Sequence, residues 1–233
     1  MRFSFITLFP DLISGYFSAG ILGRAKKNGL ISIDFVNPRD FSKDRYNKVD
    51  SPMVGGGAGM LMMPDPLVGS IRSVKNSQSR VVMLSPVGKK FTNNDALRLS
   101  RFSHIVLVSG RYEGVDERVI EGEIDEIFSV GDFILTGGEL ASLALCDSVA
   151  RNVVGVLGNS DSLEGESFEE NLLEAPAFTK PDIFEKKLII SEYLKGNHSK
   201  IAALKRALSL CKTKYFRPDL FIKVTKKASK YEK

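Results

Sequence analysis

The side chains best suited to proton transfer in this 233-residue chain are two carboxylates and one guanidinium. Glu113 follows a predicted strand, Glu166 lies in a polar loop, and Arg151 closes a predicted helix. A carboxylate can accept a proton and a guanidinium can stabilise developing negative charge, so together they suit base-catalysed transfer to a weakly acidic nitrogen. Taken alone, Arg151 is better explained as a positive charge that complements the dipole at a helix C-terminus.

Other common catalytic chemistries find little support in the composition. The chain has two cysteines, Cys146 and Cys211, and two histidines, His104 and His198. These numbers exclude a disulfide framework or a Cys-rich zinc site and favour a reducing compartment. A catalytic zinc would need carboxylates to complete its ligands, and no Ser-His-Asp or Cys-His arrangement is recognisable. Hydrolysis by a metal or a nucleophile is therefore a poor first hypothesis.

The glycine-rich segment 55–59 does not match a phosphate-binding motif. It lacks the Gly-Lys-Ser/Thr end of a phosphate loop, and it lies in a long predicted loop instead of joining a strand to a helix. The dinucleotide-binding pattern G-x-G-x-x-G is also missing after the first strand. We interpret the segment as a mobile loop.

Three predicted strands end in glycine-bearing turns, at residues 84–88, 109–114 and 130–138. Ligands of α/β sheets collect at the carboxyl ends of strands, so these turns together predict one pocket. Glycines would let the backbone approach a flat ligand such as adenine, and Leu84, Tyr112, Ile134 and Leu135 would supply apolar walls. Each turn taken singly is better explained as a tight connection between a strand and a helix.

The elements that must position these residues alternate between strands and helices, which is typical of an α/β fold with a mainly parallel sheet. The expected strands are residues 2–8, 30–36, 80–84, 105–108 and 126–130. The expected helices are residues 10–27, 93–101 after Thr92, 115–121, and a largely buried helix from a Thr136–Glu139 capping box to about residue 153.

The net charge of +5 is unevenly distributed along the chain. Residues 1–172 carry 18 Lys and Arg against 22 Asp and Glu, whereas residues 173–233 carry 15 against 6. The tail also predicts an amphipathic helix at 199–211, with Cys211 on its apolar stripe, and a second basic helix from Asp219. A basic helical tail on a mildly acidic body indicates a polyanionic partner, most often nucleic acid; a solvated Lys-rich face is the alternative.

The amino-terminal apolar run ends at Pro10 and Asp11, well short of a membrane helix, and it lacks the features of a cleaved signal. We therefore expect a cytoplasmic protein without a membrane partner.

Several motifs in combination resemble one family along nearly the whole chain. They are Pro-Arg-Asp-Phe at 38–41, Gly-Gly-Gly-Ala-Gly-Met-Leu-Met-Met at 55–63, Leu-Ser-Pro at 84–86, Gly-Arg-Tyr-Glu-Gly-Val-Asp-Glu-Arg at 110–118, Gly-Asp-Phe at 131–133, Gly-Gly-Glu-Leu at 137–140 and Pro-Ala-Phe-Thr-Lys-Pro at 176–181. Their order and spacing resemble the bacterial tRNA (guanine-N1)-methyltransferases of the TrmD type, in the SPOUT superfamily.

This resemblance implies a fold and a reaction that the patterns alone do not reach. It implies an α/β domain with a deep trefoil knot at residues 1–159, a flexible linker at 160–172 and a small all-helical tRNA-binding domain at 173–233. It also implies S-adenosylmethionine as cofactor, a homodimer with shared active sites, and methylation of N1 of the guanosine 3′ to the anticodon, position 37 of tRNA.

The resemblance assigns the cofactor site to the three strand-end turns. The implied residues are Leu84, Ser85, Pro86, Gly110, Tyr112, Glu113, Val130, Gly131, Asp132, Phe133, Ile134, Leu135, Gly137 and Gly138. Phe133 stands where the family often has tyrosine, so one hydroxyl is lost while the ring remains.

The resemblance also assigns the catalytic and tRNA-binding groups. Glu166 occupies the position of the family's catalytic aspartate and is expected to take the N1 proton, while Arg151 stabilises the charge left on O6. Asp161 and Glu164 are the alternatives for the base, and Mg²⁺ is implied near Glu113 and Glu166. The implied tRNA contacts, besides the basic tail, are Arg24, Arg39, Asp40, Asp50, Gly55, Gly57, Gly59 and His198.

Two other hypotheses compete with this assignment. One is an RNA-binding module that has kept the fold and lost catalysis, with Glu166 as the sign of relaxed chemistry. The other is a related methyltransferase acting on ribose or ribosomal RNA. Intact cofactor turns together with Arg151 disfavour the first, and the chain-long match disfavours the second.

Overall fold

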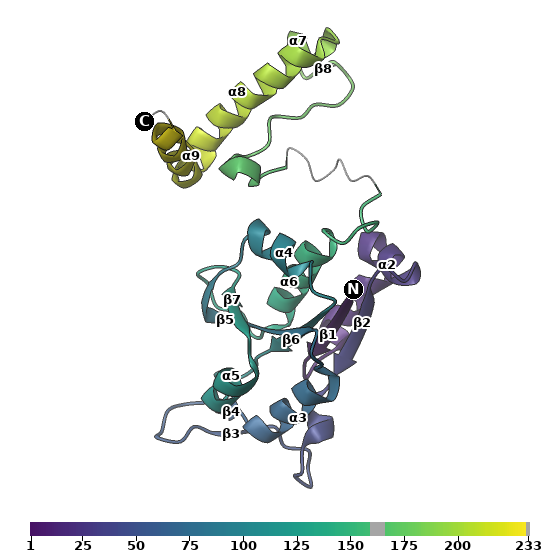
Figure 1. Cartoon of the computed structure of the whole chain (residues 1–233), viewed down its shortest axis with the longest axis vertical. Helices are drawn as coiled ribbons and strands as arrows, with labels where there is room; N and C mark the ends of the chain where they lie inside the picture. The colour runs from purple at the N-terminus through teal and green to yellow at the C-terminus, as the bar shows by residue number, and fades with distance from the viewer. Residues whose placement is uncertain (159–165, 232–233) are drawn as a thin grey trace. The chain divides into compact units, whose positions relative to one another are not determined.

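The computed structural model describes residues 1–158 and 166–231. The chain divides into two compact units, Met1–Gly158 and Asn159–Lys233, called the first and second unit below. Figure 1 shows the elements of both units. Asp161 and Glu164, the alternative candidates for the catalytic base, lie outside the described residues.

The first unit is built on a parallel sheet of five strands in the order β2-β1-β6-β5-β7. The strands are β1 (Arg2–Ile6), β2 (Ser32–Val36), β5 (Ser79–Lys90), β6 (His104–Ser109) and β7 (Glu126–Ser129). All five predicted strands are confirmed. The prediction for β5 was too short, because the strand resumes at Lys89 after its pairing with β7 shifts register beyond Leu84.

Helices cover both faces of this sheet (Figure 1). They are α3 (Pro64–Val74), α4 (Asn93–Leu99), α5 (Glu117–Glu123) and α6 (Glu139–Ala150). Phe3 and Phe5 of β1 pack in one core cluster with residues of α4 and α6, whereas Ile6 packs in a second cluster with residues of α3 and α5. Side chains buried on both sides explain why these strands read as continuous apolar runs.

The single helix predicted at residues 10–27 is wrong. The structure has α1 (Asp11–Ser14), a 3₁₀ turn η1 (Gly15–Ser18) and α2 (Gly20–Lys27). The backbone of Ala19 is extended, with φ −140° and ψ 178°, and Gly20 has φ +66°. Such a pair of conformations cannot continue a helix, and Gly20 adopts its positive φ without a steric cost.

The predicted capping box of α6 is also wrong. Gly138 is the N-cap and no side chain caps the helix. The carboxylate of Glu139 is instead buried and accepts a hydrogen bond from Thr7. The helix predicted to begin after Thr92 is confirmed, and Thr92 and Asp95 cap α4 reciprocally. The prediction that α6 is largely buried fails at Leu140, which is 60% exposed.

Two short strands, β3 (Asp50–Pro52) and β4 (Met60–Met62), form an antiparallel hairpin whose turn contains the glycine-rich segment. The 3₁₀ turn η2 (Pro38–Phe41) precedes it, with Asn37 capping Arg39 N. Met62 N donates to Gly114 O, and Asp116 N donates to Met62 O. These bonds attach the hairpin to the segment that follows β6.

The second unit consists of η4 (Glu169–Asn171), β8 (Ile183–Phe184), β9 (Lys187–Leu188), α7 (Ser191–Leu194), α8 (His198–Phe216) and α9 (Pro218–Tyr231). The prediction of an all-helical tail is corrected by the β8–β9 hairpin. Glu185 and Lys186 between these strands have φ of +46° and +65°, the geometry of a hairpin turn.

The stripe predicted for the first tail helix also needs a correction, because Cys211 is exposed. Thr213 is instead buried and donates to Ser209 O. Among the described residues, no helix is long and apolar enough to cross a membrane.

Candidate functional site

A cavity of about 430 Å³ lies in the first unit at the carboxyl edge of β5, β6 and β7. We call it the sheet-edge cavity. Its lining includes thirteen of the fourteen predicted cofactor residues: Leu84, Ser85, Pro86, Gly110, Tyr112, Glu113, Val130, Gly131, Phe133, Ile134, Leu135, Gly137 and Gly138. Asp132 is exposed and does not line it. The volume falls within the ~300–1,000 Å³ range of small-molecule sites.

Two of the turns around the sheet-edge cavity meet through their backbones. Gly138 N donates a hydrogen bond of 2.9 Å to Gly110 O. A Cβ atom at Gly138 would lie 2.9 Å from Gly110 N and from Ser109 Cα, closer than side-chain carbons approach backbone. Glycine at residue 138 therefore allows the turn after β6 and the start of α6 to close on one another.

A buried ion pair joins the same two turns. Arg111 Nε lies 3.0 Å from Glu139 Oε1 and 2.9 Å from Oε2, and Arg111 Nη1 donates to Thr136 O at 3.2 Å. Thr7, just after β1, donates to Glu139 Oε1 at 2.9 Å, and the Arg111 guanidinium lies 4.6 Å from the ring centre of Phe9. The pair thus links the ends of β1 and β6 to the turn that follows β7.

The rim of the sheet-edge cavity carries exposed rings and apolar side chains. Tyr112 is 46% exposed and has φ +59°, while Phe133 is 56% and Ile134 is 81% exposed. Gly131 faces the ring of Phe133. The backbone N–H of Gly131 donates a hydrogen bond of 3.2 Å to the Ser129 hydroxyl. An aromatic and aliphatic rim above a glycine-lined floor suits a flat base with a polar extension.

The glycine-rich segment lies against the sheet-edge cavity. A Cβ atom at Gly59 would overlap the side chain of Glu113, and Glu113 N donates to Met60 O at 2.9 Å. Gly55 and Gly57 have φ of +94° and +120°. The structure therefore brings Gly59 beside Glu113, a neighbourhood that the sequence patterns alone did not predict.

Arg151 is the C-cap residue of α6, and its backbone N–H donates to Asp147 O at 3.1 Å. Gly138 and Ala141, at the other end of the helix, line the sheet-edge cavity. At 1.5 Å per residue, Arg151 lies about 20 Å along the helix from Gly138. Arg151 is therefore remote from the cavity of its own chain.

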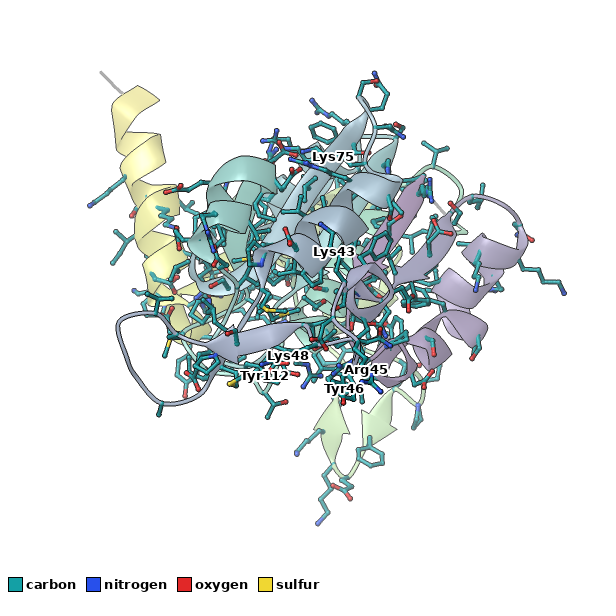
Figure 2. The ribbon with its side chains drawn as sticks, turned by 90° about the horizontal axis from the view of Figure 1, so that it is seen from below. Lys43, Arg45, Tyr46, Lys48, Lys75 and Tyr112 are labelled. Carbon is teal, nitrogen blue, oxygen red and sulfur yellow. The ribbon has the colours of Figure 1, made fainter. Side chains whose placement is uncertain are left out.

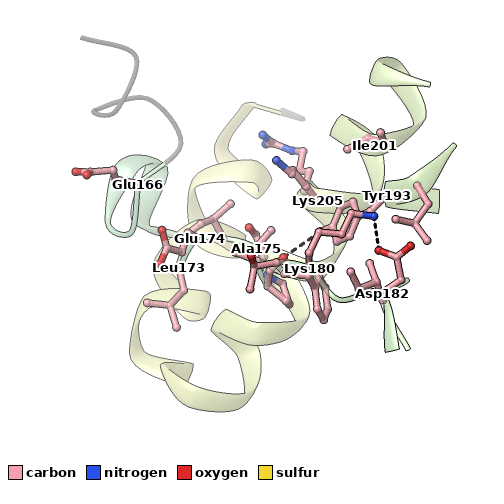
Figure 3. A pocket seen from close by; sticks show the side chains of 18 of the residues that line it. Glu166, Leu173, Glu174, Ala175, Lys180, Asp182, Tyr193, Ile201 and Lys205 are labelled. Atoms are coloured by element: carbon pink, nitrogen blue, oxygen red, sulfur yellow. Dashed lines mark hydrogen bonds and ion pairs between the residues drawn. The ribbon is translucent and has the colours of Figure 1, made fainter. Parts of the chain in front are cut away.

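Glu166 belongs to the second unit, where its side chain lies at one end of a second cavity of about 960 Å³. We call this the helix-side cavity, because α8 contributes Ile201, Lys205, Arg206 and Ser209 to its lining. Figure 3 shows the Glu166 carboxylate pointing away from the other labelled side chains. Glu166 itself is half-buried.

The side-chain contacts around the helix-side cavity lie at the protein surface. Lys180 pairs with Asp182 at 2.5 Å, as Figure 3 shows, and Tyr193 donates to Pro176 O at 3.2 Å. The ring of Phe178 lies 5.7 Å from that of Tyr193. Residues 176–180 of the Pro-Ala-Phe-Thr-Lys-Pro motif line this cavity.

The remaining predicted tRNA residues are distributed over both units. Arg24 is exposed on α2, Arg39 and Asp40 lie in η2, and Asp50 begins β3. His198 is the first residue of α8 in the second unit. Arg39 donates to Asn47 O at 3.3 Å, so its guanidinium also supports the neighbouring loop.

The described residues contain no group of three or more His, Cys, Asp or Glu that would hold a metal ion. The buried thiol of Cys146 is also unsuited to nucleophilic chemistry, because burial raises its pKa well above the usual range. Glu113 and Glu117 are the acidic side chains that line the sheet-edge cavity.

Sequence reasoning missed several residues of this site. Arg111 lies inside the 110–118 motif, but the sequence predicted no role for it. Ile120 and Ala141 reach the cavity from helices. The signal available was an arginine inside a glycine-bearing turn, between Gly110 and Gly114, but the sequence pattern assigned its partner Glu139 to a helix cap.

Known proteins resemble this chain over nearly its full length. The family model described as tRNA (Guanine-1)-methyltransferase TrmD matches residues 1–223. A tRNA (guanine-N(1)-)-methyltransferase of Sulfurovum sp. (strain NBC37-1) is 64% identical over 96% of this chain and 99% of its own length. Relatives of the same name from Campylobacter jejuni and Campylobacter fetus are 56% and 52% identical, over 97% and 100% of this chain and all of their own length.

Proposed function

Because the chain belongs to the tRNA (Guanine-1)-methyltransferase family TrmD, we propose that it transfers a methyl group from S-adenosylmethionine to N1 of the guanosine at position 37 of tRNA. The observation that carries the proposal is the sheet-edge cavity, lined by thirteen residues that the resemblance assigns to the cofactor. We propose the trefoil knot of the SPOUT superfamily for the first unit.

The cofactor would be held by the three turns of the sheet-edge cavity. Gly110, Gly137 and Gly138 let backbone groups approach it closely, and the rings of Tyr112 and Phe133 cover it at the rim. When bound, S-adenosylmethionine would supply a sulfonium methyl group for transfer to the ring nitrogen, with the neutral thioether as leaving group. The floor and rim would fix its orientation, which is how a bound geometry lowers a transfer barrier.

Glu166 acts in this proposal as the general base that takes the N1 proton of guanine. Its carboxylate points away from the other labelled side chains of the helix-side cavity (Figure 3). Arg151 stabilises the negative charge that develops on O6 as the proton leaves. The target base would be splayed out of its loop first, at a cost of a few kcal/mol in lost stacking.

A homodimer with shared sites would explain how Arg151 can take part in catalysis although it is remote from the cavity of its own chain. This residue lies about 20 Å along α6 from the sheet-edge cavity of its own chain, so the guanidinium would serve the cavity of a second copy. Leu12 of α1 and Leu140 of α6 are each 60% exposed, and Tyr16 of η1 is 50% exposed and donates to Asp147 of α6. These apolar side chains support pairing of that face with a second copy.

We also propose a metal ion, a role for each unit and a cellular compartment. Mg²⁺ is expected near Glu113 and Glu166, and no step of the mechanism depends on it. The second unit, with the basic residues 173–233, would hold tRNA together with Arg24, Arg39, Asp40 and Asp50 of the first unit, in the cytoplasm where tRNA is processed.

The experiment that tests this function uses purified protein, labelled S-adenosylmethionine and two tRNA transcripts that differ only in G or A at position 37. We expect label in the G37 transcript alone. Transfer to both transcripts, or to neither, contradicts the proposal. Absence of transfer with retained tRNA binding would favour the RNA-binding module, and label on ribose would favour the related methyltransferase.

A further inference from the structure

We propose that the loop of residues 42–48, named here the Arg45–Tyr46 loop, is a docking surface for tRNA nucleotides outside the target guanosine. The inference rests on tRNA as the proposed substrate. Its starting point is charge: residues 1–101 carry 15 Lys and Arg against 7 Asp and Glu, whereas residues 102–172 carry 3 against 15. Residues 1–101 are thus basic, although residues 1–172 taken together carry a net negative charge.

The tip of this loop presents an aromatic ring to solvent. Tyr46 is 79% exposed, and the Arg45 guanidinium lies 5.6 Å from its ring centre. A cation over one face of the ring leaves the other face open for a nucleobase. Unstacked RNA bases are commonly held on tyrosine rings and guanidinium planes in this way.

The loop is held in shape by its own hydrogen bonds. Asp44 Oδ1 accepts from Tyr46 N at 2.8 Å, and Asp44 O accepts from Asn47 N at 3.0 Å. Ser42 Oγ donates to Lys48 O at 2.5 Å, and Arg39 Nη1 donates to Asn47 O at 3.3 Å. A ring presented on an ordered loop loses less conformational freedom on binding than one on an unstructured loop.

Two exposed lysines of the same loop are suited to phosphates. The side chain of Lys43 is 87% exposed, with the Asp65 carboxylate 4.0 Å from its Nζ, and Lys48 is exposed as well. Figure 2 shows Lys43, Arg45, Tyr46 and Lys48 on the ribbon of the first unit. Cations beside an exposed ring match the alternation of phosphates and bases along an RNA strand.

Backbone bonds connect the Arg45–Tyr46 loop to the sheet-edge cavity. The loop continues into Val49, whose carbonyl accepts from Met63 N at 2.8 Å. In the same hairpin, Met62 N donates to Gly114 O at 3.0 Å, within the turn that lines the cavity. The loop is thus attached to the wall of the cavity that would hold the cofactor, and the target base must lie beside that cofactor for transfer, which suits contact of the loop with neighbouring nucleotides.

The test compares Tyr46→Ala and Tyr46→Phe in steady-state methylation and in direct tRNA binding. Because a base stack is lost, we expect Tyr46→Ala to raise KM and Kd for tRNA roughly tenfold, with KM for S-adenosylmethionine, kcat and Tm unchanged. Tyr46→Phe keeps the ring and should behave as the wild type. Unchanged tRNA binding by Tyr46→Ala, or a loss shared by Tyr46→Phe, overturns the proposal.

Arg45→Ala should weaken tRNA binding and lower the slope of log Kd against log salt by about 1. The matched control is Arg101→Ala, an exposed arginine near the amino edge of the sheet, where Arg2 N donates to Ser103 O. An equal effect of both arginine variants contradicts a specific docking surface. If the wild type transfers no methyl group, the proposed function fails, whereas the binding comparison still decides this inference.

Discussion

The sheet-edge cavity and the helix-side cavity differ in how their polar groups are held. In the smaller one, Arg111 and Glu139 are 16% and 2% exposed and tie separate strand ends together. In the larger one, Lys180 and Asp182 are 79% and 45% exposed and lie two residues apart in sequence. A larger volume therefore does not mark the more strongly organised site.

This difference separates the roles of the two units. A cavity with fixed, buried polar groups is suited to one small molecule in one orientation. A cavity with exposed ion pairs is weakly stabilised by them and is better completed by a charged partner. We therefore expect changes at the sheet-edge cavity to alter cofactor binding, and changes at the helix-side cavity to alter tRNA binding and proton transfer.

The largest expected effect comes from Glu166→Gln, because an amide cannot accept the N1 proton. The single-turnover rate of methyl transfer should fall by at least about a hundredfold, while the Kd for S-adenosylmethionine stays within error. Glu166→Asp is the matched control and should retain measurable transfer. A turnover close to that of the wild type in Glu166→Gln would assign the base elsewhere and break the division of roles.

The substitution Arg111→Ala should have the second largest effect. Leaving Glu139 buried without its partner costs about 3–5 kcal/mol of stability, and the turns around the cavity lose their link. Denaturant unfolding and the Kd for S-adenosylmethionine measure the two consequences.

The double variant Arg111→Met with Glu139→Leu is the control for a purely structural role. It should recover most of the stability, because no buried charge is left unpaired, without recovering cofactor affinity. Recovery of both would show that the ion pair does not position the cavity.

Neutralising the second unit should have a smaller and more selective effect. With Lys200, Lys205 and Lys223 all replaced by Gln, the Kd for tRNA at physiological salt should rise roughly tenfold, and its salt dependence should weaken. All three lysines are exposed. The same replacement at Lys26, Lys27 and Lys90 of the first unit is the matched control, and equal effects of the two sets would contradict a tRNA-holding second unit.

The smallest expected effect concerns pH and the first unit alone. His104 is buried between the hydroxyls of Ser4 and Ser79, and burial lowers its pKa below the ordinary 6.5. The unfolded chain therefore binds this proton more readily, so stability should be lost as the pH falls below about 6.5. Tm measured from pH 7.5 to 5 should decline less steeply in His104→Gln, and identical profiles would contradict this role.

Strand positions could be predicted from the sequence because burial on both faces leaves continuous apolar runs, as in β6. The break between α1 and α2 could not, since it depends on the backbone of Ala19 and Gly20 and not on a change in apolar periodicity. The β8–β9 turn at Glu185 and Lys186 lacks the Asn-Gly or Asp-Gly signal of such turns.

For the site, glycine-bearing strand ends predicted which segments meet, because parallel strands end at one edge of the sheet. The role of Glu139 could not be predicted, since its carboxylate is used by Arg111 and Thr7, which are distant in sequence. The cofactor, base and tRNA assignments stay predictions until they are measured.

The Arg111–Glu139 pair also bears on how this protein would respond to selection. Replacing a buried ion pair by apolar side chains of similar volume is often neutral or stabilising, by up to about 4 kcal/mol. A screen for heat resistance would then favour losing the pair, whereas a screen for methyl transfer would retain it. Arg111 and Glu139 are thus positions at which thermostability and activity would select opposite residues.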